Sequence, residues 1–465
     1  MHDIEKQFEP FDQRMQEANL PEIFIKNFQH QYIKLLRGET GRISESEIQP
    51  VSDLPDAEHL EKQYLDAGEA HLSQSVFLKL NGGLGTSMGL ERAKSLLTVK
   101  NNLTFLDIIA RQSIQGNFRL LLMNSFSTRQ DSLAFLQKYP QLGSEIPLDF
   151  LQHKAPKVLQ NNLSPAVWSE NPKLTWCPPG HGDLYIALYS SGILEQLLAA
   201  GYRYAFISNA DNLGAVLDAR ILGYFAENEL PFMMEAADRT DADKKGGHLA
   251  QRTDGQLILR EIAQCPEEDL ESFQNVERHR YFNTNNLWVD LRALFGLLQQ
   301  QNFILDLPMI RNQKTLDPRD SASPAVFQIE TAAGSAISVF KNSAAIRVPR
   351  TRFAPVKNTN DLLAVRSDRY TISKEFNIIP IPAQEEGAIE IDLDSRYYKL
   401  IDDFETRFLQ GPPSLKNCQK LKVTGDFKFG KEVGFWGQVE ITNSGTSQIL
   451  LPDGKRIEGK LVYPA

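Results

Sequence analysis

The sequence predicts an α/β fold with a mixed, mostly parallel central sheet, preceded by helices and followed by a second, β-rich domain. Changes in the residue pattern divide the chain. Up to about residue 70 apolar residues recur at helical spacing, and from about 75 to 370 short apolar strands alternate with amphipathic segments. The last ninety or so residues combine regularly spaced apolar residues with glycines. A chain of 465 residues is long enough for two or three domains.

The first segment, residues 1–75, is predicted to be helical. Its clearest stretch covers residues 21–36, with Gly38 as a stop signal. The apolar residues of this stretch lie on one helical face: Ile23, Phe24, Phe28, Tyr32 and Leu35. The pattern therefore predicts an amphipathic helix.

The second segment, residues 76–372, carries the alternating pattern. Its predicted strands include residues 76–80, 118–123, 204–208 and 232–235. Strands that alternate with helices form mostly parallel sheets, and such sheets bind ligands at the carboxyl ends of their strands. We therefore expect the functional site in the loops that follow these strands.

The third segment, residues 373–465, has a different repeat. The apolar residues that recur every six positions are Leu421, Phe427, Val433 and Val439, and the glycines between them are Gly425, Gly430, Gly434 and Gly437. This spacing is typical of the coils of a β-helix. A glycine-rich β-meander is the alternative.

Composition and charge narrow the class of protein. The net charge of −9 argues against nucleic acid as the main partner, because binding it requires a basic surface. No apolar run approaches the roughly 20 residues that span a bilayer, and the polar N-terminus lacks the apolar core of a signal peptide. The three cysteines are far apart and lack metal-ligand spacing, which favours reduced thiols. We expect a cytoplasmic protein without a membrane partner.

The most informative stretch follows the first predicted strand. Four glycines lie within residues 82–89, and Lys94 comes five residues after the last of them. Glycines let backbone N–H groups approach a phosphate closely, and a lysine adds a mobile positive charge, although a lone lysine is often simply solvated. The loop is neither a Walker A motif nor a dinucleotide fingerprint, because no Gly-Lys-Ser/Thr follows and the glycine spacing is GxGxxxG. It predicts a phosphorylated ligand.

A second candidate site follows the strand at residues 204–208. Asp211 lies at the carboxyl end of this strand, where a carboxylate oxygen suits Mg²⁺ that also bridges substrate phosphates. An Asx turn at Asp211 and Asn212 is the structural alternative. On the functional interpretation, Asp211 is a metal ligand.

Several stretches together resemble the eukaryotic-type UTP–glucose-1-phosphate uridylyltransferases, also called UDP-glucose pyrophosphorylases. They are residues 81–89 with Lys94, residues 176–183, residues 209–214 and residues 347–357. With further short blocks they run in the family's order from about residue 76 to 370. The chain departs from the family at residues 92–93, where Arg-Ala replaces Gly-Pro before the lysine.

The resemblance implies a fold and a reaction. The fold is a Rossmann-like, GT-A-like nucleotidyltransferase domain over residues 76–372 with a left-handed β-helix over residues 373–465. The reaction is Mg²⁺-dependent, in-line attack of a glucose-1-phosphate oxygen on the α-phosphorus of UTP, which gives UDP-glucose and pyrophosphate. The implied partners are these two small molecules, with a homo-oligomer through the C-terminal domain as a further possibility among relatives.

The resemblance also implies the site residues. Lys94, Lys357 and Asp211 are the expected catalytic residues, and Asp211 is the expected metal ligand. The expected nucleotide contacts are Leu80, Asn81, Gly82, Gly83, Lys94, Gln152, Gly180, Asp211 and Lys357. The expected sugar-phosphate contacts are His181, Asn209, Gly247, Glu261 and Asn285, with Asn283 as the alternative to Asn285.

The implied chemistry is mainly electrostatic. The attacking phosphate oxygen is already ionised near pH 7, so the step needs no general base, whereas two unit charges of equal sign 4 Å apart repel by roughly 4 kcal/mol at an effective dielectric of about 20. Lys94, Lys357 and Mg²⁺ would neutralise that repulsion. The alternatives are the same reaction on galactose-1-phosphate or N-acetylglucosamine-1-phosphate, a non-catalytic nucleotide-sugar sensor, and a hydride-transferring Rossmann enzyme.

Overall fold

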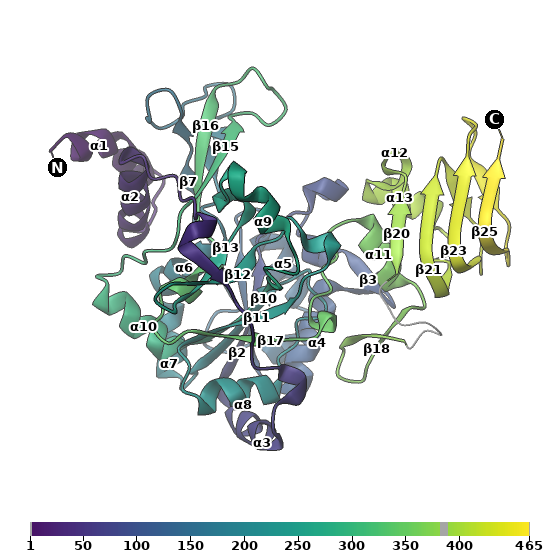
Figure 1. The fold of residues 1–465 in the computed structure, drawn as a ribbon, viewed down its shortest axis with the longest axis horizontal. Helices are drawn as coiled ribbons and strands as arrows, with labels where there is room; N and C mark the ends of the chain where they lie inside the picture. Colours follow the sequence, from purple (N-terminus) through teal and green to yellow (C-terminus); the bar gives the residue numbers. More distant parts are fainter. Residues whose placement is uncertain (1, 382–388, 465) are drawn as a thin grey trace.

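A computed structural model describes residues 2–381 and 389–464, and its centre is a ten-stranded mixed sheet (Figure 1). The strands of this sheet are β1 (Ile48–Pro50), β2 (Ser75–Asn81), β5 (Arg119–Asn124), β6 (Asp149–Leu151), β10 (Tyr204–Asn209), β11 (Phe232–Asp238), β12 (His248–Arg252), β13 (Leu257–Arg260), β14 (Tyr281–Asp290) and β17 (Ala344–Arg347). Their order is β1-β12-β14-β10-β2-β5-β6, while β11 pairs with β14 and β17, and β13 pairs with β12.

Most strands of the central sheet run in one direction. β10, β2, β5 and β6 are parallel neighbours. β14 is antiparallel to β10, β11 and β12, so these three share a direction, and β17 is parallel to β11. Of the ten strands, β1, β13 and β14 run the opposite way. The predicted mixed, mostly parallel sheet is therefore confirmed.

Helices cover both faces of the sheet. Val76 and Leu78 of β2 enter one core, and Phe77 between them enters another, because successive side chains of a strand point to opposite faces. The first core also receives residues from α1 (His2–Glu17), α2 (Glu22–Leu36), α6 (Leu184–Ser190), α7 (Ile193–Ala199) and α10 (Leu291–Gln300). The second receives residues from α4 (Phe105–Gly116), α5 (Arg129–Leu136) and α8 (Ala219–Glu227).

The N-terminal segment is mainly helical, as predicted. α2 ends at Leu36, and Gly38 follows with a φ of 79°, a left-handed conformation that favours glycine. The predicted apolar face is largely buried, with Phe24, Phe28 and Tyr32 in the first core. The same segment also contains the helix α3 (Lys62–His71) and the strand β1 of the central sheet. The sequence did not predict β1, because a strand of three residues is too short to show an alternating pattern.

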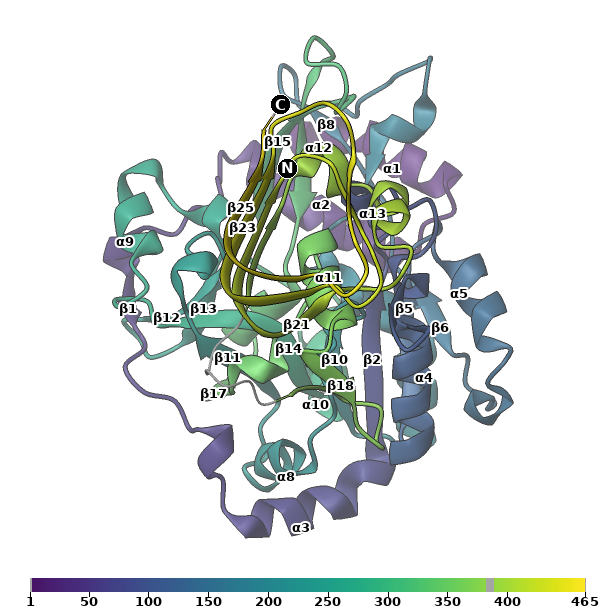
Figure 2. The same cartoon turned by 90° about the vertical axis from the view of Figure 1, so that its right-hand side faces the viewer.

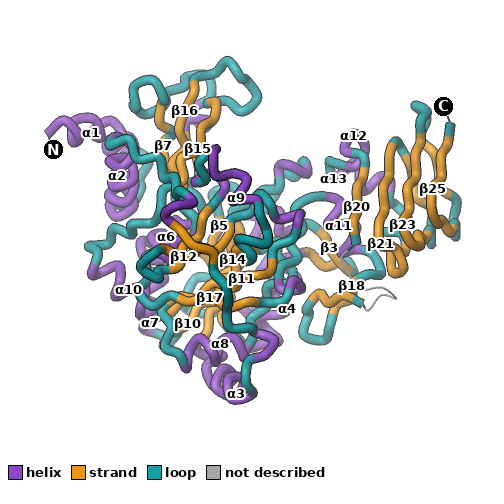
Figure 3. Tube along the Cα trace, viewed as in Figure 1, coloured by secondary structure: helices purple, strands orange, loops and turns teal. Residues whose placement is uncertain are grey.

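Smaller sheets and helices surround the central sheet. The hairpin of β15 and β16 pairs with β8 and projects from the body of the molecule (Figure 3). The strands of the small sheets are β3 (Thr98–Lys100), β4 (Leu103–Thr104), β7 (Ala155–Pro156), β8 (Val158–Leu159), β9 (Trp176–Cys177), β15 (Ile310–Thr315), β16 (Ala325–Glu330), β18 (Tyr370–Ile372) and β19 (Ile378–Pro380). The remaining helices are α9 (Leu270–Gln274), α11 (Thr359–Arg366), α12 (Ser395–Tyr398) and α13 (Ile401–Arg407).

The C-terminal strands stack at the end of the molecule opposite α1 and α2 (Figures 1 and 2). They are β20 (Glu390–Leu393), β21 (Ser414–Thr424), β22 (Phe427–Phe429), β23 (Gly434–Asn443), β24 (Ile449–Leu451) and β25 (Arg456–Tyr463). β20, β21, β23 and β25 pair in parallel, as do β22 and β24. A meander is built from antiparallel hairpins, so these pairings exclude it. The six-residue repeat marks core positions, since Leu421, Phe427, Val433 and Val439 are all buried.

A third hydrophobic core joins the C-terminal strands to the glycine loop. It contains Leu421 and Phe429 together with Met88 and Leu97, which flank Lys94. A Cβ on Gly89 would lie 3.2 Å from the side chain of Leu400, so the loop touches the C-terminal segment directly. The C-terminal strands therefore support the loop as well as their own domain. The predicted domain boundaries at residues 75 and 372 stay a prediction.

Helices α3 and α8 cross at two glycines. A Cβ on Gly68 would lie 1.6 Å from Ala219 O, and a Cβ on Gly223 would lie 1.8 Å from Tyr64 O. Since backbone atoms occupy both positions, neither site has room for a side chain.

We expect Gly223→Ala to lower the free energy of unfolding by about 2–3 kcal/mol, because the helices must separate to admit the methyl group. The matched control is Gly296→Ala in α10, where a Cβ meets no atom within 4 Å and alanine is the better helix former. Urea unfolding followed by fluorescence measures both variants. Equal stability of Gly223→Ala and the wild type would contradict the close crossing.

Candidate functional site

The loops that follow β2, β5, β6 and β10 lie at one edge of the sheet. Asn81 pairs in register with Asn124, and Asn124 with Leu151, while Leu80 pairs with Asn209 on the other side. These residues end four parallel strands, so the loops after them share the edge at which such sheets bind ligands. The predicted location of the site is consistent with this arrangement.

The glycine loop folds back over Lys94. Gly83 O accepts a hydrogen bond from Lys94 N at 3.0 Å, and Gly85 has a φ of 70° that turns the chain. A Cβ on Gly85 would lie 3.2 Å from Cγ of Lys94, whereas a Cβ on Gly83 would meet no atom within 4 Å. The loop thus holds the lysine close and leaves open space beside Gly83.

Lys94 and Asp211 meet although 116 residues lie between them. The Lys94 Nζ donates a hydrogen bond to Asp211 Oδ2 at 2.6 Å, and both side chains are more than three-quarters buried. Such a pair is less screened by water than a surface ion pair. The structure therefore brings together two of the three predicted catalytic residues.

Lys357 belongs to a strap, residues 352–357, that runs alongside the Asp211 loop. Val356 N donates to Asp211 O at 3.0 Å. The Lys357 Nζ lies 5.6 Å from the ring centroid of Phe353, and the residue is exposed. The third predicted catalytic residue thus follows directly after the backbone contact with Asp211, and its exposed ammonium group is accessible to a ligand.

The carboxyl group of Asp361 is bonded to the main chain at the end of the strap. It accepts hydrogen bonds from Lys357 N at 2.7 Å and Asn358 N at 3.0 Å. Burial raises the pKa of Asp361, and these two N–H groups and the charges of Lys357 and Lys94 partly offset that rise. The charges of both lysines thus favour the ionised form of Asp361.

Gln152 lies directly over Gly82. A Cβ on Gly82 would lie 2.9 Å from Gln152 Oε1, and Gln152 N donates to Asn124 O at 2.8 Å. In contrast, the Asn81 side chain is buried and donates to Asn124 Oδ1 and Ser132 Oγ. Gln152 is thus placed to present its amide beside the glycine loop, whereas Asn81 can offer a ligand its main chain rather than its side chain.

The loop that contains Gly180 is held by the segment after β16. Thr331 O accepts from Gly182 N at 2.8 Å, and Thr331 N donates to Pro179 O at 3.0 Å. Gly180 has a φ of 81°, and a Cβ there would lie 2.3 Å from Thr331 O. Only glycine fits this position without moving the loop.

His181 is exposed and oriented by one hydrogen bond. Ala333 N donates to His181 Nδ1 at 2.9 Å, which places the ring proton of the neutral imidazole on Nε2. His181 can therefore donate a hydrogen bond to a ligand oxygen.

Two predicted sugar-phosphate residues contact each other. Asn285 Nδ2 donates to Asn209 Oδ1 at 2.9 Å, and Asn285 has a φ of 59°. The Asn285 Oδ1 is buried without a hydrogen-bond partner among the described residues, while Asn283 Oδ1 accepts from Asn285 N. A buried acceptor without a partner suits a donor from a ligand, which favours Asn285 over Asn283.

Glu261 lies against Gly247. A Cβ on Gly247 would lie 2.6 Å from the Glu261 carboxylate, so glycine is needed for this approach. Burial raises the pKa of Glu261. Gly247 directly precedes β12 and Glu261 directly follows β13, next to the paired residues His248 and Arg260.

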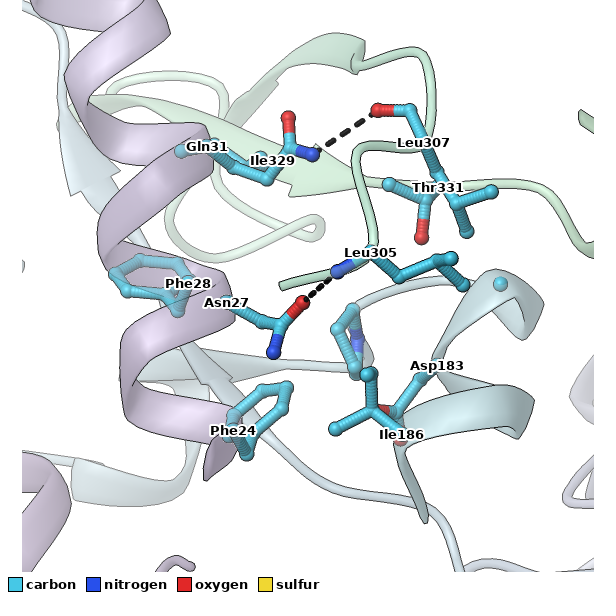
Figure 4. A pocket seen from close by; sticks show the side chains of 12 residues that line it. Phe24, Asn27, Phe28, Gln31, Asp183, Ile186, Leu305, Leu307, Ile329 and Thr331 are labelled. Carbon is cyan, nitrogen blue, oxygen red and sulfur yellow. Dashed lines mark hydrogen bonds between the residues drawn. The ribbon is translucent and has the colours of Figure 1, made fainter. Parts of the chain in front are cut away.

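A separate pocket lies behind the Gly180 loop (Figure 4). Residues of α2 form one side, including Phe24 and Gln31, and Gly182 and Asp183 form the other. None of the predicted site residues lines this pocket. The Asp183 carboxylate accepts from His153 N and contacts His153 Nδ1, both at 2.7 Å, and thereby ties the Gly180 loop to the residue after Gln152.

Sequence reasoning missed the residues that hold the loops in place. These residues are Thr331, Asp183 and Asn212. Each forms hydrogen bonds between loops that are distant in sequence, and such bonds leave no pattern in the local sequence. Arg352 lies in the stretch 347–357 that resembles the family. Its contact with Glu235 could not be predicted either, because the two residues are distant in sequence and meet only in the folded chain.

Among residues 2–381 and 389–464, no three His, Cys, Asp or Glu residues form a group able to hold a metal ion. No helix in the same part of the chain is long and apolar enough to cross a membrane. The three cysteines are free, which agrees with the predicted reduced thiols, and all three are buried.

We expect Gly180→Ala to loosen the pairing with Thr331, because the new methyl group would overlap Thr331 O and the backbone conformation disfavours alanine. Hydrogen exchange at the Gly182 and Thr331 amides should become at least tenfold faster. The control is Gly83→Ala, which has open space and should leave these two amides unchanged. Unaltered protection in Gly180→Ala would show that the contact does not restrict this loop.

The chain is similar to proteins of one family. A family model described as UTP–glucose-1-phosphate uridylyltransferase matches residues 25–435. The UTP–glucose-1-phosphate uridylyltransferase of Hordeum vulgare is 39% identical over 441 residues, which cover 92% of this chain and 90% of the relative. That of Saccharomyces cerevisiae is 38% identical over 400 residues, which cover 84% and 79%.

Solved structures show the same similarity. A variant of UDP-glucose pyrophosphorylase from Leishmania major in complex with UDP-glucose has a TM-score of 0.90 and 42% identity, and the match covers 99% of both chains. A Trypanosoma brucei structure named UDP-glucose phosphorylase has a TM-score of 0.85 and 44% identity, covering 98% of this chain and 100% of that one.

Proposed function

The chain belongs to the UTP–glucose-1-phosphate uridylyltransferase family, and we propose that Lys94, Asp211 and Lys357 form its phosphate-transfer site. Its reaction transfers the uridylyl group from UTP to glucose-1-phosphate and gives UDP-glucose and pyrophosphate. The observation that carries the proposed site is the 2.6 Å contact between Lys94 Nζ and Asp211 Oδ2, with the Lys357 strap bonded to Asp211 O.

The reaction requires two polyanions to approach in line. The attacking oxygen of glucose-1-phosphate is already ionised, so the role of the protein is to neutralise charge and fix the reactants in place. Lys94 and Lys357 supply positive charge from two separate segments, one after the glycine loop and one at the end of the strap. The Lys94 ammonium is held by Asp211 without substrate, and the phosphates of UTP compete for it.

The donor set at Asp211 fits Mg²⁺ bound together with a nucleotide. Mg²⁺ usually takes one or two carboxylates and completes its octahedral shell with water and phosphate oxygens, so a three-residue cluster is not required. Asp211 would hold the ion with the phosphates of UTP, and the ion would add positive charge there. Because Lys94 pairs with the same carboxylate, we propose that Mg²⁺ binds weakly before the nucleotide and tightly with it.

The uridine is read by the loops on the opposite side of β2. Gln152 presents an amide above Gly82, and amides can pair with the carbonyl and N–H groups of a uracil edge. Gly180 offers its backbone at a position that excludes a side chain. Leu80 and Gly83 complete the nucleotide contacts that we propose.

The glucose-1-phosphate lies, in this proposal, between the Gly180 loop and the ends of β12–β14. Its hydroxyl groups need both acceptors and donors, which the Glu261 carboxyl group and the Asn285 amide supply. His181 and Asn209 bind the phosphate group of glucose-1-phosphate. Gly247 has no side chain, so Glu261 can lie against it. Glucose-1-phosphate is the preferred substrate, and galactose-1-phosphate or N-acetylglucosamine-1-phosphate should turn over more slowly.

Three broader features belong to the same proposal. The parallel C-terminal strands and their buried six-residue repeat support a left-handed β-helix. The open edge of β25 is where the C-terminal domains of two copies can associate. Buried free cysteines are consistent with a reducing compartment such as the cytoplasm.

We expect Lys357→Ala to lower kcat for UDP-glucose formation by about 100- to 1,000-fold, as expected for loss of a preorganised charge. The dissociation constant of UDP-glucose should change less than threefold, because the uridine contacts lie elsewhere. Pyrophosphate release from UTP and glucose-1-phosphate measures kcat, and calorimetry measures binding.

The matched control for Lys357→Ala is Arg350→Ala. Arg350 is a nearby cation whose guanidinium donates to Asp243 Oδ2 at 2.6 Å, so its charge is used outside the proposed site. The control should keep kcat within about threefold. An unchanged kcat in Lys357→Ala would remove this lysine from the mechanism.

We expect Asp211→Asn to need at least tenfold more Mg²⁺ for half-maximal turnover, because an amide oxygen is a weaker ligand than a carboxylate. A Mg²⁺ titration of the initial rate at fixed UTP gives the midpoint.

The control for Asp211→Asn is Asp218→Asn at the start of α8. Asp218 accepts hydrogen bonds from Arg220 N and Ile221 N, and asparagine caps helices equally well. Its Mg²⁺ midpoint should equal that of the wild type. The same midpoint in Asp211→Asn would show that Asp211 is not the ligand.

A further inference from the structure

Asn212 joins the Asp211 loop to the Lys357 strap. Its side chain is buried and makes four hydrogen bonds. The Oδ1 accepts from Ala354 N at 2.9 Å and from Gly214 N at 3.2 Å. The Nδ2 donates to Arg352 O at 3.1 Å and to Asn286 Oδ1 at 3.2 Å. One amide thus joins the segment that carries Asp211 to the segment that carries Lys357.

The strap is also fixed to the sheet by a buried ion pair. The Arg352 guanidinium donates to both oxygens of Glu235, at 2.6 and 2.8 Å, and to Val216 O at 2.9 Å. Glu235 is fully buried and accepts further hydrogen bonds from Asn286 and Trp288. A buried carboxylate with this many donors is held in one geometry. The start of the strap is therefore rigid.

The loop and the strap are in direct backbone contact. A Cβ on Gly214 would lie 2.2 Å from Thr351 O and 2.8 Å from Arg352 C. With Val356 N bonded to Asp211 O, the strap is held to the loop from its start at Arg352 to Val356. Lys357 is the next residue, so the position of its Cα follows from these contacts.

We propose that Asn212 is a positioning residue that sets the separation between the Asp211 carboxylate and the Lys357 ammonium group. Asn212 itself faces away from the substrates, because its side chain is buried and all its hydrogen bonds go to the protein. It acts through Lys357. The inference rests on the proposed role of Lys357, and Lys357→Ala alone tests that role separately.

A double-mutant cycle distinguishes positioning from a general loss of stability. We expect Asn212→Ala to lower kcat by about 10- to 100-fold, since a displacement of about 1 Å near reacting groups can cost a factor of 100. The dissociation constant of UDP-glucose should change less than threefold. In a Lys357→Ala background, Asn212→Ala should lower kcat by less than threefold, because the group that it positions is already absent.

The control is Asn443→Ala in β23. Asn443 is also buried and closes a loop, donating to Asp426 O and Ser447 O, but it lies in the C-terminal sheet. It should lower the midpoint of thermal unfolding as much as Asn212→Ala does and keep kcat within threefold. Asn212→Asp keeps the two acceptor contacts and removes both donor contacts. This variant replaces Asn212→Ala in the experiment if the alanine variant does not fold.

Three results would overturn the proposal. Equal losses of kcat from Asn212→Ala in both backgrounds would make its effect independent of Lys357. A loss of UDP-glucose affinity equal to the loss of kcat would indicate a damaged binding site. A wild-type kcat in a folded Asn212→Asp variant would show that the donor contacts to Arg352 O in the strap and to Asn286 Oδ1 do not matter. A silent Lys357→Ala, in contrast, would refute the proposed function of that lysine itself.

Discussion

Repulsion between two anionic substrates is the constraint on which this site depends, because neither can reach the other without positive charge held at the point of contact. In the proposed site, this charge comes from two lysines that are remote in sequence, Lys94 after the glycine loop and Lys357 at the end of the strap. Asp211 lies between them, bonded to the first through its carboxylate and to the second segment through its main-chain carbonyl. The rest of the architecture keeps these three positions in register.

Polar side chains buried in the protein interior hold the Asp211 loop and the Lys357 strap in place. Glu235, Arg352 and Asn286 form a buried network under the strap, and replacing either partner of such an ion pair would leave the other charge without compensation. Lys79 lies under the Asp211 loop and donates to Ser208 Oγ and Ala215 O. Burial lowers the pKa of Lys79 from 10.5 to about 7, so the unfolded chain binds this proton more tightly and the folded state loses stability as the pH falls from about 10 to 7.

The C-terminal strands take part in the same arrangement. Their hydrophobic core includes Met88 and Leu97 on either side of Lys94, and Val356 next to Lys357. Both cationic segments are therefore packed on one apolar cluster that lies outside the central sheet.

Much of the fold could be predicted from local patterns. The strands β2, β5, β10 and β11 lie where apolar runs predicted them, and α2 ends before the glycine that marked its stop. Local patterns and the family resemblance also indicated Lys94 and Asp211 as site residues. They could not show that these two side chains pair, because the contact joins distant segments. The same holds for Asn212 and Thr331, whose hydrogen bonds exist only once the sheet has formed.

The most direct test of the charge arrangement is a crystal structure of the chain with Mg²⁺ and a non-hydrolysable UTP analogue. The account predicts that the Lys94 ammonium leaves Asp211 for the phosphates, that Asp211 contacts the metal ion, and that the Lys357 ammonium lies within about 3 Å of a phosphate oxygen, the length of a charge-assisted hydrogen bond. A complex in which Lys94 remains paired with Asp211 while Lys357 points into solvent would contradict it.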